Sequence, residues 1–295
     1  LCANGSGHAG DRQGDLRIQQ PGQIAVVCSR ADPASFNIFG RLLELQAWQE
    51  CKGYRSSGNF RLLVHDDKQT ALIGLDDRLA DLDLYPDMIV LPCRHEAKAA
   101  LPWFGGHFTG ILEVGEGKSR LSAAAPSGLR SFLHNISAIV SLSMPGYMVS
   151  AEATHHAPVD VRTPSFFAEI GSTKEQWVDL KAGEAVARAI LALEPVELPV
   201  FLGFGGGHYV QRQTELIFNS RIAFGHMFSS YQVPDLDLEA VEIARESSNA
   251  TYAYIDRKSL RSAERKRLEG MVEEIGLPML KAQEIRARFS PSDAI

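Results

Sequence analysis

The stretch LPVFLGFGGGHY, residues 198–209, indicates the fold most directly. An apolar run ends in three glycines and a histidine, which is typical of a buried strand that turns sharply at its carboxyl end. A dinucleotide-binding loop would need a glycine where His208 stands, and a P-loop would need Gly-Lys-Ser/Thr. We therefore interpret the glycines as a turn that brings the backbone close to a substrate. The turn presents His208 at the edge where open α/β sheets hold their sites.

Strand and helix patterns alternate around this stretch. Residues 23–29 and 87–95 are apolar runs ending in polar side chains, and both are predicted as buried strands. Residues 32–50 and 173–193 carry apolar side chains at helical spacing behind suitable capping residues. Further strands are predicted at 60–66, 71–74 and 147–158, and further helices at 126–143 and 266–277. This alternation predicts an α/β fold.

Length and composition allow one large domain or two small ones. The chain has 295 residues, of which 45% are hydrophobic and 22% charged, as in ordinary globular proteins. Residues 1–22 are polar and glycine-rich and lack the apolar centre of a signal peptide, so we predict a flexible leader. Residues 23–295 contain no repeat or linker. We expect them to form a single α/β domain, with room for a small subdomain.

Charge and cysteine usage limit the partners. A formal net charge of -6 excludes a generally basic nucleic-acid coat, so any such partner needs a local basic patch. The four cysteines are scattered, with no CxxC pair, which suits a reducing cytoplasm and argues against a cysteine-type zinc site. No uncharged apolar run reaches the ~18 residues of a membrane span. We expect a cytoplasmic monomer that binds neither membrane nor DNA.

Histidines gather at the ends of predicted strands. A single histidine is usually a hydrogen-bonded core or surface group, but several in such loops indicate metal binding or acid–base chemistry. The six loop histidines are His95, His107, His155, His156, His208 and His226. Glu169 lies between apolar residues and a helix cap, so its burial would suit a base or a ligand. The alternative for Glu169 is a hydrogen bond to the following helix N-terminus.

Four motifs in a fixed order carry a family resemblance. They are ATHHAP at 153–158, PSFFAEIGSTKEQW at 164–177, GFGGGHY at 203–209 and AFGHMFSSY at 223–231. Together they resemble the archaeal and plant type of D-aminoacyl-tRNA deacylase. Agreement extends from residue 23 to about residue 289. The resemblance implies a hydrolase that cleaves the ester between a D-amino acid and tRNA. It also implies a zinc cofactor and a three-layer α/β/α fold similar to phosphorylases and peptidyl-tRNA hydrolase.

The resemblance also implies roles for individual residues. The residues expected to be catalytic are His156, His208, Glu169, Gly206 and Gly207. Those expected to bind metal are His155, His156, His208 and His226, and those expected to bind substrate are Arg94, His95 and Tyr209. This chain departs from the family pattern at Cys93, where serine is usual, and at WFGGH, where Thr-Val-His is usual. His95 and His107 therefore have a weaker claim than the other loop histidines.

Two mechanisms are open at this stage. In one, two or three of the histidines hold zinc, which activates water while Glu169 acts as base or ligand. In the other, backbone N–H groups of residues 205–207 form an oxyanion pocket, and a histidine or the substrate's 2′-hydroxyl moves the proton. A zinc-dependent small-molecule amidohydrolase or peptidase is the alternative function, and a non-catalytic RNA-binding module is a further one.

The C-terminal region carries the strongest basic bias. Residues 257–288 contain nine basic and five acidic side chains, against the acidic balance of the whole chain. We predict that this segment, with Arg265 and Lys266, binds the acceptor stem of the tRNA. The alternative is an ordinary solvated helix face.

Overall fold

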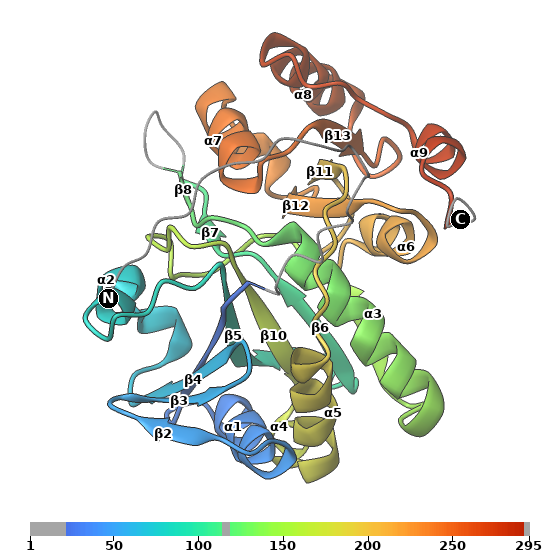
Figure 1. Cartoon of the computed structure of the whole chain (residues 1–295). Helices are drawn as coiled ribbons and strands as arrows, with labels where there is room; N and C mark the ends of the chain where they lie inside the picture. The colour runs from blue at the N-terminus through green and yellow to red at the C-terminus, as the bar shows by residue number, and fades with distance from the viewer. Residues whose placement is uncertain (1–21, 114–118, 292–295) are drawn as a thin grey trace, which may run out of the picture.

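The structure is a computed structural model that describes residues 22–113 and 119–291. All but one residue of the predicted leader, 1–22, lies outside the described residues. A large mixed sheet and a smaller parallel sheet form the framework, with helices packed around both (Figure 1).

The large sheet has eight strands in the order β2-β3-β4-β1-β5-β10-β6-β9. Its central strands run parallel, and these are β4 (Phe60–His65), β1 (Ile24–Ser29), β5 (Met88–Glu96) and β10 (Ser165–Ser172). The flanking strands are β2 (Gln49–Cys51), β3 (Tyr54–Ser57), β6 (Trp103–His107) and β9 (Met148–Ala151). β6 runs antiparallel to β10, and β9 runs parallel to β6. The α/β class with a mixed, largely parallel sheet is therefore confirmed.

Alternating side chains bury both faces of this sheet. In β1, Ile24 and Val26 belong to one hydrophobic cluster, while Ala25 and Val27 belong to another on the opposite face. The first face is covered by α1 (Pro33–Leu45), α3 (Pro126–Ser143) and α5 (Leu180–Leu191). The second packs against η1 (Gln69–Ala71) and α2 (Leu75–Ala80). A fully apolar strand thus reflects burial on both sides.

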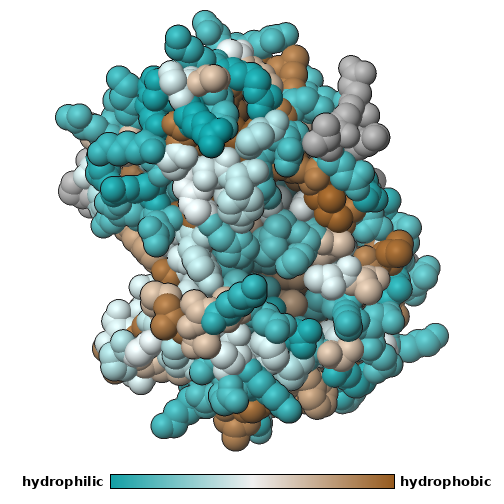
Figure 2. All heavy atoms as spheres, turned by 180° about the vertical axis from the view of Figure 1, so that it is seen from behind, coloured by the Kyte–Doolittle hydropathy of each residue, from teal (hydrophilic) through white to brown (hydrophobic). Residues whose placement is uncertain are grey.

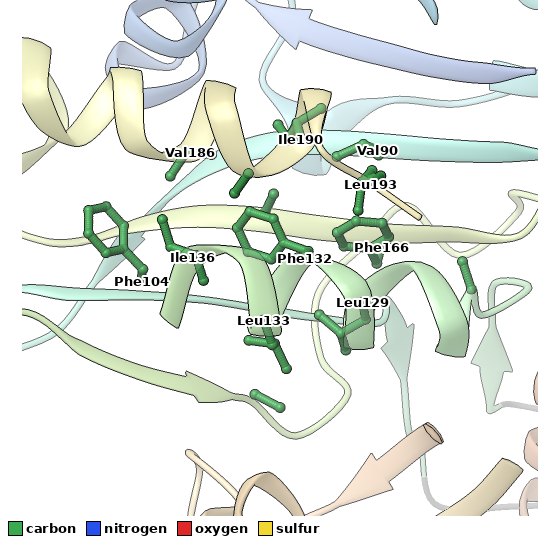
Figure 3. Close-up of a cluster of buried hydrophobic side chains, with 14 of the residues drawn as sticks. Val90, Phe104, Leu129, Phe132, Leu133, Ile136, Phe166, Val186, Ile190 and Leu193 are labelled. Carbon is green, nitrogen blue, oxygen red and sulfur yellow. The ribbon is translucent and has the colours of Figure 1, made fainter. Parts of the chain in front are cut away.

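Figure 3 shows the main core, where α3 and α5 meet the sheet. Phe132 and Ile136 of α3 pack near Phe166 of β10, and Ile190 reaches the same layer from α5. All four side chains are at most 1% exposed. Burial of a side chain of this size contributes about 1.5–3 kcal/mol, so this layer is a principal source of stability.

Several predicted elements differ from the observed ones. The helix expected over 32–50 ends at Leu45, and residues 49–51 form β2 instead. The strand expected over 147–158 ends at Ala151. The helix expected over 173–193 divides at Asp179 into α4 (Lys174–Val178) and α5, because Asp179 is extended and its carboxylate caps α5 at the Lys181 N–H. The strand expected at 71–74 is wrong. Gln69 donates hydrogen bonds to the carbonyl groups of Val27 and Pro92, which hold this segment across the sheet instead of along its edge.

The smaller sheet has three parallel strands in the order β12-β11-β13. They are β12 (Ala223–Phe228), β11 (Val200–Phe204) and β13 (Tyr252–Ile255). Helices α6 (Gln211–Asn219), α7 (Leu238–Ser248), α8 (Ser262–Glu274) and α9 (Ala282–Arg288) surround it (Figure 1). A two-stranded ribbon, β7 (Gly110–Ile111) and β8 (Arg120–Leu121), lies near α7.

The surface carries scattered hydrophobic side chains. On the face shown in Figure 2, hydrophilic residues predominate and the hydrophobic ones do not gather into one patch. Among the described residues, no helix is both long and apolar enough to cross a membrane.

Candidate active site

Strand register brings three site residues to one face of the large sheet. Cys93 and His95 are two residues apart in β5, so their side chains point to the same face. Phe167 packs in the cluster that contains Cys93, and Glu169 follows two residues later in β10. His107, the last residue of β6, pairs directly with Phe167. His95, His107 and Glu169 therefore gather on one face of three neighbouring strands.

A second carboxyl group, Glu152, lies beside them. Glu152 follows β9, and its backbone N–H donates to the Gly106 carbonyl group at 3.0 Å, which continues the pairing of β9 with β6. Its side chain is completely buried. The sequence analysis missed Glu152. An acidic residue in an apolar strand segment, three positions before the paired histidines, is the signal that could have identified it.

Two loops add the remaining histidines. His155 and His156 follow β9, and His208 follows the glycine turn after β11. A hydrogen bond from the Ala153 N–H to the His208 carbonyl group, 2.8 Å long, joins the loops. The ring centre of His155 lies 4.0 Å from that of His107 and 4.8 Å from that of His208. The site is thus built by the larger sheet and by the loop that leaves the smaller one.

Glycines in β6 allow this close approach. A Cβ atom at Gly105 would lie 2.0 Å from the Ser150 carbonyl oxygen, and one at Gly106 would lie 2.1 Å from the Phe167 carbonyl oxygen. No real Cβ could occupy either position without moving the strands apart. The WFGGH segment is therefore required for packing β6 between β9 and β10.

The tautomers of two histidines follow from their hydrogen bonds. The Nδ1 atom of His107 lies 3.0 Å from the Phe108 carbonyl oxygen, and that of His155 lies 2.7 Å from the Ala153 carbonyl oxygen. A carbonyl oxygen can only accept, so Nδ1 carries the proton in each ring. Nε2 of His155 then lies 4.0 Å from the Glu152 carboxyl group, and Nε2 of His107 lies 3.6 Å from the Glu169 carboxylate.

Several buried polar atoms of the site have no hydrogen-bond partner among the described residues. They are both carboxyl oxygens of Glu152, Oε2 of Glu169 and Nε2 of His107. An unsatisfied buried carboxylate is costly, so this cluster requires a cation, a proton or water between its members.

The positions of the donor atoms fit a zinc ion. Glu152 Oε1 lies 3.2 Å from His95 Nδ1 and 2.9 Å from His208 Nε2. Zinc–ligand bonds of about 2.0–2.2 Å in a tetrahedral site place the ligand atoms about 3.4 Å apart. The other nitrogen of His95 lies 3.0 Å from the Tyr209 hydroxyl, and that of His208 lies 3.1 Å from the Tyr231 hydroxyl. Such outer hydrogen bonds orient metal-binding imidazoles.

Glu152 also belongs to a second possible metal group. Within the described residues, two sets of three side chains place ligand atoms within 4.8 Å of one another: His95, Glu152 and His208, and His107, Glu152 and His155. Of the expected ligands, His208 and His155 are members of these sets, whereas His156 and His226 are not.

The two carboxyl groups differ in protonation. Burial raises the pKa of Glu152 well above its usual range, and the neighbouring Glu169 raises it further. Burial also opposes the charge on Glu169, but His107 and His95 lower the pKa of Glu169 below its ordinary value. At neutral pH Glu169 is therefore ionised, while Glu152 holds a proton or faces a cation.

The histidines of the site are mostly neutral. Burial is the main cause that lowers the pKa values of His95, His155, His156 and His208. His107 differs, because Glu169 outweighs its burial and raises its pKa. Neutral imidazoles can accept protons or bind a metal, so the arrangement suits hydrolytic chemistry.

His226 requires a correction. It is completely buried, and its Nδ1 and Nε2 atoms lie 3.0 Å from the Thr154 hydroxyl and 3.0 Å from the Ser122 carbonyl oxygen. Both ring nitrogens are thus engaged, and neither is free to bind a metal. His226 is a structural residue that supports the segment preceding His155.

The glycine turn supports His208 by its conformation. Gly205 and Gly206 have φ values of 88° and 85°, in the left-handed region that favours glycine. The N–H of Gly206 donates to the Ser259 hydroxyl at 2.7 Å, so it is not free to form an oxyanion pocket as the sequence analysis expected. Gly207 keeps that possibility, because its N–H has no hydrogen-bond partner among the described residues.

The expected substrate-binding residues occupy different regions. His95 and Tyr209 lie within the histidine cluster, and Arg94 lines the cavity above it. Arg265 and Lys266 lie on α8, beside the smaller sheet. Arg265 Nε is 3.8 Å from Glu269, whereas Lys266 is exposed.

Comparison with known proteins identifies the family. The family profile described as D-aminoacyl-tRNA deacylase matches residues 82–280, which include every member of the cluster. The chain belongs to the D-aminoacyl-tRNA deacylase family. The match confirms the resemblance seen in the sequence motifs.

Relatives of this deacylase family cover nearly the whole chain. D-aminoacyl-tRNA deacylase of Methanothrix thermoacetophila is 46% identical over 269 residues, spanning 90% of this chain and 99% of its own. The enzyme of Methanosarcina barkeri is 37% identical over 281 residues, with coverages of 90% and 92%. The crystal structure of a conserved protein of unknown function has a TM-score of 0.83 at 30% identity, covering 92% of this chain and 99% of its own.

Proposed function

We propose that the chain hydrolyses the ester between a D-amino acid and the terminal ribose of tRNA, releasing both. The observation that carries this proposal is a buried Glu152–Glu169 pair surrounded by five histidines, in a chain of the deacylase family. Two carboxyl groups with separated pKa values and several neutral imidazoles supply the proton acceptors and donors that ester hydrolysis needs.

Zinc is the proposed cofactor, and the unsatisfied oxygens of Glu152 support it. His95, Glu152 and His208 would hold the ion. Bound there, zinc would supply Lewis-acid chemistry at neutral pH.

The residues of the chain provide the proton transfers. Glu169 is ionised and therefore can accept the proton of the attacking water. His107 faces Glu169 and stabilises its charge before and during this transfer. His156 lines the cavity, is neutral and lies outside both ligand sets, so one ring nitrogen can accept the proton that Glu169 took from water while the other donates its proton to the departing ribose oxygen.

The tRNA body requires contacts beyond the cavity. We propose that α8 contributes them through Arg265 and Lys266, because α8 lies on the surface of the smaller sheet and exposes Lys266. Part of the basic bias is neutralised internally. Arg257 pairs with Glu269 at 2.8 Å, and Arg267 donates to backbone carbonyl groups. The remaining surface is modestly basic.

The test is release of labelled D-tyrosine from D-tyrosyl-tRNA, beside the L-ester, before and after chelation with zinc add-back. D-selective release that falls on chelation and returns with zinc is the expected result. Full activity after exhaustive chelation would contradict the proposal of a zinc cofactor. Hydrolysis would then depend on the side chains alone. No release from either ester would overturn the proposed function.

A further inference from the structure

The cavity at the site is lined by both the histidine cluster and basic side chains. It has a volume of about 360 Å³, suited to a small group and too small for a folded stem. Its lining includes His156, His208 and Glu169, together with the basic side chains of Lys68 and Arg94. Two positive charges therefore lie in the same cavity as the proposed hydrolytic centre.

The chain holds Arg94 in a defined position. The Arg94 N–H donates to the Asp32 carboxylate at 3.2 Å, and the guanidinium group lies 5.0 Å from the ring centre of Trp177. Trp177 in turn donates from Nε1 to the His95 carbonyl group at 2.9 Å. The stacked Arg94 and the catalytic segment are thus fixed to each other, which reduces the entropy cost of binding an anion there.

The guanidinium group retains donors for a ligand. Arg94 Nε lies 4.0 Å from Asp32, a carboxylate that already accepts from the Ser35 and Arg94 N–H groups and the Cys93 thiol. The two terminal nitrogens of Arg94 have no hydrogen-bond partner among the described residues. Lys68 is exposed and has no ion pair within the same part of the chain, and the exposed Glu96 is the opposing charge at the rim.

We propose that Arg94 and Lys68 bind the phosphodiester on the 5′ side of the substrate's terminal adenosine. This inference rests on the proposed function, since it concerns the same cavity. The ester and that phosphate are attached to one ribose, so a cavity that seats the ester must have a group for the phosphate nearby. A guanidinium fork matches two phosphate oxygens, and an ammonium adds a point charge. The pair thereby orients the ester toward Glu169.

The experiment uses two small substrates. One is the D-tyrosyl ester of cytidylyl-(3′→5′)-adenosine, and the other has a neutral methylphosphonate in place of the phosphodiester. The quantity measured is the ratio of kcat/KM for the charged substrate to that for the neutral one. Because each protein serves as its own reference, this ratio is insensitive to the fraction of folded enzyme.

The unmodified protein should prefer the charged substrate by roughly tenfold or more, as expected for hydrogen bonds to a charged group. Arg94→Gln should lose most of that preference, Lys68→Gln a smaller part, and Arg94→Lys should retain an intermediate value. The matched control is Arg188→Gln, since Arg188 pairs with Glu184 on α5 and does not line the cavity.

Failure of the phosphate site and failure of the proposed function give different results. Hydrolysis of both substrates with the same preference in Arg94→Gln as in the unmodified protein would overturn the phosphate site and leave the deacylase intact. Absence of hydrolysis of either small ester and of D-tyrosyl-tRNA by the unmodified protein would overturn the proposed function itself, and the phosphate site with it.

Discussion

Two neighbouring histidine environments show what separates a histidine that is available for chemistry from a structural one. His226 is buried behind Thr154, with a hydroxyl group and a carbonyl group on its two nitrogens. His155, the residue after Thr154, has a carbonyl group on one nitrogen and a carboxyl group facing the other. Both side chains are largely buried, so burial does not separate them. The partner of the second nitrogen does.

The two environments also differ in how completely their polar groups are hydrogen-bonded. Around His226 every described polar partner is satisfied, as in an ordinary core. In the cluster, both oxygens of Glu152 lack a hydrogen-bond partner among the described residues. Polar groups left unsatisfied in one small region mark the place where binding free energy is available to a metal or a substrate.

Substitution of Glu169, the proposed base, should have the largest effect. Glu169→Gln removes the ionised carboxylate while preserving shape, so kcat for D-aminoacyl-tRNA should fall by about 10²–10⁴-fold. The matched control is His226→Gln, which alters the structural histidine. Its kcat should stay within a few-fold of that of the unmodified protein. Comparable losses of kcat in both variants would contradict the distinction between the histidine cluster and the environment of His226.

The pH dependence of stability should reveal His226. Burial lowers the pKa of His226 from 6.5 to about 4. The unfolded chain therefore binds a proton below pH 6.5 that the folded protein excludes, so the stabilising contribution present above pH 6.5 is lost as pH falls toward 4. The contribution is about 3 kcal/mol.

His226→Gln should remove this dependence. Urea unfolding of both proteins at pH 7 and pH 4.5 measures it: the unmodified protein should lose more stability than the variant over this interval. Parallel losses would show that His226 is protonated in the folded protein without penalty.

Closing the space in β6 should disturb the cluster without changing any of its polar groups. Gly106→Ala places a methyl group against the Phe167 carbonyl oxygen, and overpacking of this kind costs about 1–3 kcal/mol. The thermal midpoint should fall, and kcat should fall with it because His107 follows directly in the strand. Gly146→Ala, where a Cβ would meet no atom within 4 Å, is the control.

Charge reversal on α8 should have the smallest effect. Arg265→Glu with Lys266→Glu should weaken tRNA binding severalfold at low salt and make its salt dependence shallower, while hydrolysis of a minimal ester stays unchanged. The paired reversal Lys181→Glu with Arg188→Glu on α5 is the control. Equal weakening by both pairs would indicate general charge repulsion, and no weakening by the α8 pair would exclude α8 from the interface.

Local sequence patterns predicted most of the helices and strands. They predicted less well which side chains from distant segments meet at the candidate site. The helix at 126–143 and the capping of α1 by Asp32 follow from nearest-neighbour chemistry, and both are observed. Glu152 was missed because only the register of β9 with β6 brings it beside His107. His226 was predicted as a metal ligand because the motifs show only that a histidine is present. Its hydrogen-bond partners, Thr154 and Ser122, come from distant segments that the motif does not include.

The shared construction of the cluster also bears on biosynthesis. Glu152 and His107 are held by strands that end at or before Ala151, but His208 is held by a turn that hydrogen-bonds to Phe228 and Ser259. A nascent polypeptide can therefore assemble the acidic half of the centre early and completes it only after residue 259 has left the exit tunnel.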